Sequence, residues 1–190
     1  MRYEIPVVGF GREGVADMGL FAAIFLGLMG LFAVAHLAAG FVRKKGADAH
    51  YDRGDPTYYA MIASLGLLVA AIVAEAVAMG AVPSTPTMWV GRAMVVGSLF
   101  WTLWCRKVIG DNYVSTARNT DPSQTLVTHG PYRFMKHPIY MANIATAVGL
   151  ALAFSVRWSW GAVAVFVAVV IWRIRLEEAH LREKFGEAYP

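Results

Sequence analysis

The chain has 190 residues, of which 57% are hydrophobic and 16% are charged, and its formal net charge is +4. A soluble domain carries about 25% charged residues, so this composition is typical of a membrane protein and excludes a disordered chain. The single cysteine, Cys105, excludes a disulfide scaffold. The length suits one domain, and the basic residues lie between apolar runs, so we expect no nucleic-acid partner.

Five long apolar runs predict an all-α fold, a polytopic bundle of five transmembrane helices. The runs cover residues 18–42, 58–82, 88–105, 139–156 and 159–172. The first run is not a cleavable signal peptide, because Arg43-Lys44-Lys45 follows it instead of a small-residue cleavage site. The last run is short for a span, so we expect its helix to continue into the charged stretch after it. Residues 83–87 hold two prolines and predict a tight turn.

The basic residues predict the orientation of these spans. Residues 43–57, 106–138 and 173–190 hold 13 of the 17 lysines and arginines, and five spans would place all three segments on one side. Basic loops stay in the cytoplasm, so we expect the N-terminus outside and the C-terminus inside. The protein would then lie in the inner membrane of a bacterium or in the endoplasmic reticulum of a eukaryote.

The same topology predicts where the chemistry lies. Residues 1–105 form a three-span membrane region, and residues 106–190 comprise a long loop, a helical hairpin and a C-terminal helix, within one integrated domain. The hairpin would bring residues 106–138 and the charged tail together at the cytoplasmic face. Long connections in compact proteins are often functional.

Two motifs flank this hairpin. Gly130-Pro131-Tyr132-Arg133 and Lys136-His137-Pro138-Ile139-Tyr140 precede it, and Glu177-Glu178 and Phe185-Gly186-Glu187-Ala188-Tyr189 follow it. Together they resemble the isoprenylcysteine carboxyl methyltransferase family, whose wider group includes the phospholipid methyltransferases. The resemblance covers about residues 105–190. It implies an integral-membrane enzyme that transfers the methyl group of S-adenosylmethionine.

The resemblance also implies roles for individual residues. It implies that Arg173 meets the substrate and that ten residues bind the cofactor, namely Gln124, Thr125, Leu126, Val127, Tyr132, His137, Pro138, Ile139, Tyr140 and Glu177. Arg173 and Glu177 are four residues apart, so a helix would present both on one face. No strand followed by G-x-G-x-x-G is present, so the cofactor site would be built from helix ends and the loop.

The methyl acceptor remains open between two chemistries. A carboxylate, such as that of a prenylated cysteine, needs no base and would be held by Arg173 through a charge-assisted hydrogen bond. An amine, hydroxyl or thiol must lose a proton, and Glu178 is the nearest candidate base. A phospholipid amine, a quinone, a phenol or another lipophile therefore stays an alternative acceptor. Membrane lipid is the expected partner, and the sequence predicts no oligomeric state.

Other interpretations of the same residues remain. His137-Pro138 is also a normal helix start, and Glu177 and Glu178 also suit the solvated face of an interfacial helix. Glu75, inside a span, is either functional or a hydrogen-bonded residue that packs helices. His36, in the first span, is interpreted as a hydrogen-bonded interior histidine. If instead both are functional, the chain is a non-catalytic transport protein. No cluster has metal-ligand spacing, so we expect no metal.

Overall fold

Four α-helices make up most of the part of the chain that the structure describes. The computed structural model describes residues 55–79, 85–113, 117 and 122–189. The helices are α2 (Pro56–Met79), α3 (Pro86–Ile109), α4 (Pro138–Ala153) and α5 (Trp160–Phe185), with short 3₁₀ turns η2 (Gly110–Asn112), η3 (Gly130–Arg133) and η4 (Gly186–Ala188). These residues contain no strand, which confirms the all-α prediction for them.

Prolines begin three of the helices and glycines end two of them. Pro56, Pro86 and Pro138 are the first residues of α2, α3 and α4, because a proline has the helical φ angle and needs no hydrogen-bond acceptor in the first turn. The turn predicted for residues 83–87 is wrong at Pro86 and Thr87, because these are the first two residues of α3. Gly110 and Gly186 end α3 and α5 with φ angles of +54°, which a glycine adopts at little cost.

Each of the last four predicted runs lies mostly within a helix, although residues 154–156 of the fourth run follow the end of α4. Within the described residues, α2 and α3 are long and apolar enough to cross a membrane, since each has 24 residues, about 36 Å of helix. The 16 residues of α4 are apolar but short. As predicted, α5 continues without a break into the charged stretch and ends at Phe185. The predicted span 18–42 lies outside the described residues.

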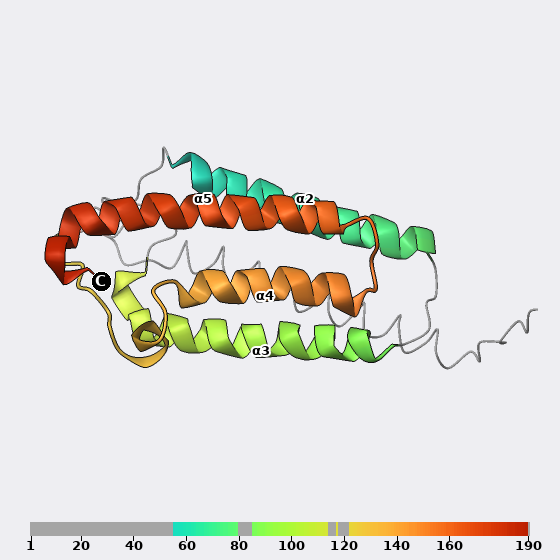
Figure 1. The fold of residues 1–190 in the computed structure, drawn as a ribbon, viewed down its shortest axis with the longest axis horizontal. Coiled ribbons are helices and arrows are strands. Elements are labelled where there is room, and N and C mark those ends of the chain that lie inside the picture. The colour runs from blue at the N-terminus through green and yellow to red at the C-terminus, as the bar shows by residue number, and fades with distance from the viewer. Residues whose placement is uncertain (1–54, 80–84, 114–116, 118–121, 190) are drawn as a thin grey trace, which may run out of the picture. The chain divides into compact units, whose positions relative to one another are not determined.

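The helices pack in two pairs, with α2 along α5 and α3 along α4 (Figure 1). Between α3 and α4, Gly91 and Gly149 let the two backbones approach closely, and the hydroxyl groups of Ser98 and Thr146 are 2.7 Å apart. Several large apolar side chains are exposed; Val77 is 77% exposed and Phe100 is 67% exposed. Such an outer surface suits hydrocarbon rather than water.

Candidate functional site

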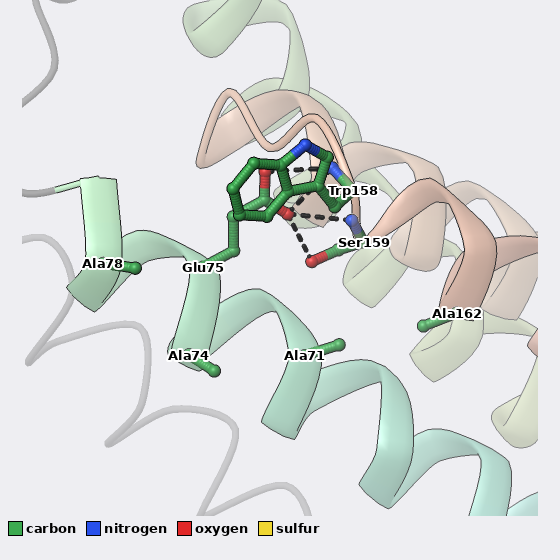
Figure 2. A pocket seen from close by; sticks show the side chains of 7 residues that line it. All are labelled: Ala71, Ala74, Glu75, Ala78, Trp158, Ser159 and Ala162. Carbon is green, nitrogen blue, oxygen red and sulfur yellow. Dashed lines mark hydrogen bonds between the residues drawn. The ribbon is translucent and has the colours of Figure 1, made fainter.

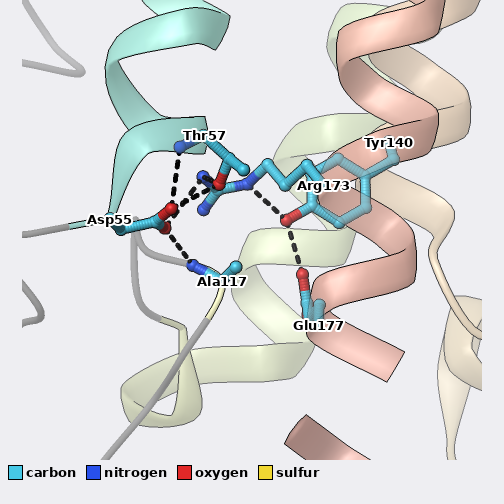
Figure 3. Close-up of polar contacts among 6 residues, drawn as sticks. All are labelled: Asp55, Thr57, Ala117, Tyr140, Arg173 and Glu177. Carbon is cyan, nitrogen blue, oxygen red and sulfur yellow. Dashed lines mark hydrogen bonds and ion pairs between the residues drawn. The ribbon is translucent and has the colours of Figure 1, made fainter. Parts of the chain in front are cut away.

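The start of α4 and the last half of α5 meet in a chain of polar contacts. The Tyr140 hydroxyl donates to Oε2 of Glu177 at 2.5 Å and accepts from Nε of Arg173 at 2.8 Å (Figure 3). Arg173 and Glu177 lie one turn apart on α5, as their spacing predicted. Residues from the two flanking motifs are therefore in direct contact.

Arg173 is held on its other side by residues at the start of α2. Its Nη1 donates to the Thr57 hydroxyl at 3.1 Å and lies 3.4 Å from Oδ2 of Asp55 (Figure 3). Asp55 also accepts hydrogen bonds from the backbone N–H of Thr57 at 2.9 Å and of Ala117 at 2.6 Å. Arg173 is 3% exposed, Asp55 5% and Thr57 0%, so this whole cluster is buried.

The environment of Asp55 and Glu177 changes their acidity in opposite directions. Burial acts to raise the pKa of Asp55, but the hydrogen bonds from Thr57 and Ala117 and the charge of Arg173 hold it below 3.8. Burial raises the pKa of Glu177 above its ordinary value, although Tyr140, His137 and Arg173 act to lower it. Asp55 is the carboxylate that forms the ion pair with Arg173.

A second group of contacts surrounds Glu178, the predicted base. Its Oε1 lies 3.4 Å from Nε2 of His137, and its Oε2 accepts from Nη2 of Arg182 at 3.2 Å. His137 stands directly before α4, so His137-Pro138 is also a helix start, as one interpretation predicted. Each oxygen of Glu178 thus faces a nitrogen of a basic side chain.

Two tyrosine hydroxyl groups are buried near these glutamates. Tyr132, on η3, and Tyr189, after η4, have buried hydroxyls without a hydrogen-bond partner among the described residues. Burial raises the pKa of Tyr132 well above its ordinary value. Burial, together with the charges of Glu178 and Glu177, raises the pKa of Tyr189 to about 12. Both groups are therefore neutral donors. A buried donor without a partner costs about 1–3 kcal/mol, which a ligand could recover.

The loop residues predicted to bind the cofactor link the ends of α3 and α5. Oε1 of Gln124 accepts from Nζ of Lys184 at 2.8 Å, near the end of α5. The backbone N–H of Thr125 donates to Oδ1 of Asn112 at 2.8 Å, in η2. Three further predicted residues, Leu126, Val127 and Ile139, are half-buried, and Pro138 is buried. The loop is thus attached beside the site, and Thr125 contacts η2 rather than the predicted site residues.

Glu75 lies at the other end of α2 and has a packing role. Its carboxylate accepts hydrogen bonds from the backbone N–H groups of Arg157, Trp158 and Ser159 and from the Ser159 hydroxyl, the last at 2.7 Å (Figure 2). These groups lie directly before the first residue of α5, Trp160, where a carboxylate is favoured. A hollow of about 380 Å³ beside it is lined mainly by alanines. Of the two interpretations of Glu75, the structure supports helix packing, and His36 lies outside the described residues.

Sequence reasoning missed Asp55 and Thr57. The available signal was an aspartate directly before a proline and a long apolar run, which is typical of a helix N-cap. That signal predicts the contact with the backbone N–H of Thr57. It does not predict the contact with Arg173, more than a hundred residues away in the sequence.

Comparisons with known proteins place this chain in a family and give one curated relative. A family model described as phospholipid methyltransferase matches residues 86–188, from the start of α3 to the end of η4. The chain is also 31% identical over 153 residues to an uncharacterized protein, YpbQ, of Bacillus subtilis (strain 168); the alignment covers 80% of this chain and 88% of that protein. No solved structure matches the chain. The matched range includes every predicted site residue and leaves out Asp55 and Thr57.

Proposed function

This chain belongs to the phospholipid methyltransferase family, and we propose that it is an integral-membrane enzyme that transfers a methyl group from S-adenosylmethionine to a lipophilic acceptor. Membership of the family implies methyltransferase activity in general. The two long apolar helices support a membrane location. We further propose the five-span topology, with the site at the cytoplasmic face, where the water-soluble cofactor has access from the cytoplasm and the acceptor from the bilayer.

The observation that carries this proposal is the pair of buried, unpartnered tyrosine hydroxyls beside two glutamates. S-Adenosylmethionine brings a sulfonium, an ammonium, a carboxylate and two ribose hydroxyls. The Tyr132 hydroxyl is a neutral donor for its carboxylate or adenine, the Glu177 carboxylate is an acceptor for ribose or ammonium, and the ring of Tyr140 is a face for the sulfonium. The residues present therefore fit this cofactor. We propose that the ten residues implied by the resemblance hold it.

When bound, S-adenosylmethionine supplies an activated methyl group for in-line displacement. The chain's own residues then contribute proximity, alignment and exclusion of water. Arg173 holds the Tyr140 hydroxyl, and Tyr140 holds Oε2 of Glu177, so one face of α5 and the first turn of α4 are fixed relative to each other. An acceptor that loses a proton would pass it to a carboxylate, for which Glu178 remains the proposed base.

We propose a lipid or a small lipophile as acceptor. The family description favours a phospholipid amine, whereas the resemblance of the flanking motifs favours a carboxylate such as that of a prenylated cysteine. A quinone, a phenol or a thiol is a further alternative acceptor.

The test is calorimetric titration of S-adenosylmethionine, and of S-adenosylhomocysteine, into detergent-purified protein. We compare the wild type with Glu177→Ala and with Glu183→Ala, an exposed glutamate on the same helix. We expect saturable binding by the wild type, at least tenfold weaker binding by Glu177→Ala, and no change in Glu183→Ala. If a folded wild-type sample binds neither compound, the methyltransferase proposal is wrong.

A further inference from the structure

Asp55 connects three separate segments of the chain at one point. It stands directly before α2, it accepts the backbone N–H of Ala117 from the segment after α3, and it forms an ion pair with Arg173 of α5. Its carboxylate and the Thr57 hydroxyl together bind Nη1 of Arg173 (Figure 3). The ion pair with Arg173 is more than helix capping requires, because backbone N–H groups alone satisfy an N-cap aspartate.

The contacts of Asp55 continue without a gap to the proposed cofactor residues. Arg173 uses Nη1 for Asp55 and Thr57, and it uses Nε for the Tyr140 hydroxyl at 2.8 Å. A guanidinium is planar, so fixing Nη1 also fixes the direction of Nε. Tyr140 in turn donates to Oε2 of Glu177. A displacement of Arg173 would therefore remove the hydrogen bond that orients the Tyr140 hydroxyl, the partner of Glu177.

The charges in this cluster show why Arg173 needs Asp55. A buried cation without a counter-ion is strongly disfavoured, and Arg173 is 3% exposed. Asp55 supplies that counter-ion from outside the matched range 86–188. Since Arg173 is already paired with a carboxylate, its charge is compensated before any acceptor arrives.

Resting on the proposed function, we propose that Asp55 is a positioning residue of the methyl-transfer site, which acts by holding Arg173 against Tyr140. Asp55 itself touches neither cofactor nor acceptor. Asp55 acts on the site through Arg173. Its effect on the site should therefore disappear in a variant in which residue 173 carries no charge.

The experiment is a double-mutant cycle on the affinity for S-adenosylmethionine, measured by calorimetry in detergent. The variants are Asp55→Asn, Arg173→Gln and the double variant. We expect Asp55→Asn to weaken binding about tenfold in the wild-type background and less than twofold in the Arg173→Gln background, because contacts in one network couple. A residue that only stabilises the fold would weaken binding by the same factor in both backgrounds, and that result would overturn the proposal.

Glu75→Gln is the matched control, since Glu75 is a buried carboxylate near the other end of α2 that binds Ser159, directly before α5. We expect it to lower the melting temperature and to leave affinity within twofold. If Asp55→Asn does not fold, Thr57→Val takes its place in the double-mutant cycle, because it removes the second acceptor of Arg173. Failure of wild-type binding would refute the proposed function, whereas wild-type binding that Asp55→Asn and Thr57→Val leave unchanged would refute only the positioning role.

Discussion

The unpartnered hydroxyl of Tyr132 gives a prediction in which stability and binding change in opposite directions. Tyr132→Phe removes one buried oxygen and keeps the aromatic ring of this η3 residue. In the ligand-free protein the hydroxyl has no hydrogen-bond partner among the described residues, so its removal should stabilise the fold. If the hydroxyl donates to S-adenosylmethionine, the same substitution should weaken binding.

The size of both effects follows from the burial of the hydroxyl. An unsatisfied buried hydroxyl costs about 1–3 kcal/mol, and relaxation around it favours the lower end. For a chain of this length, about 1 kcal/mol corresponds to a rise in melting temperature of about 2–4 °C. Loss of one hydrogen bond to the cofactor is worth about 1 kcal/mol, or roughly a fivefold weaker affinity. Thermal unfolding without ligand and calorimetric titration measure the two quantities.

Tyr113→Phe is the matched control, because the Tyr113 hydroxyl accepts from Nη2 of Arg106 at 3.0 Å. That substitution breaks an existing hydrogen bond, so it should lower the melting temperature. A fall in the melting temperature of Tyr132→Phe comparable to that of Tyr113→Phe would show that the Tyr132 hydroxyl has a partner in the ligand-free protein. The argument from an unpartnered donor would then be wrong.

Two further predictions concern packing and acidity. A Cβ at Gly91 would lie within 3.0 Å of backbone atoms of Gly149 and Ala153, so Gly91→Ala should destabilise the protein by about 1–3 kcal/mol in thermal unfolding. A Cβ at Gly97 meets nothing within 4 Å, so the control Gly97→Ala should be neutral or stabilising in the same measurement. The folded-state pKa of Asp55 is below 3.8, so its stabilisation is present above pH 3.8 and is lost as the pH falls further. The difference in melting temperature between wild type and Asp55→Asn should therefore be larger at pH 6 than at pH 3; an equal difference would contradict the ion pair.

The sequence predicts the helices well because their signals are local. The apolar runs predicted the four helices α2 to α5. The apolar part of α5 is too short for a span, which predicted that the helix continues into the charged stretch. The start of α3 was placed two residues late, at Met88 instead of Pro86, because hydropathy begins at the first apolar residue whereas the helix begins at the proline. Boundaries are thus set by backbone geometry that hydropathy does not measure.

The candidate site was predictable where one hairpin forms it. Tyr140 and Glu177 flank the α4–α5 hairpin, so its antiparallel packing alone brings them together. The contact between Asp55 and Arg173 joins α2 to α5, and it depends on which helices pair. Hydropathy does not determine helix pairing, since every apolar helix can pack against every other one. The partner of Arg173 therefore emerges only from the folded arrangement.

The two buried carboxylates of the α2 region show how the same residue type takes different roles. Asp55 and Glu75 are 20 residues apart, about 30 Å along a helix, and each binds the α5 region near one end of α2. Glu75 accepts only from backbone N–H groups and a serine hydroxyl, partners present at many helix starts. Asp55 is also paired with an arginine whose other nitrogen binds a proposed cofactor residue. The partner, rather than burial or the carboxylate itself, therefore distinguishes a carboxylate that packs helices from one that organises the site.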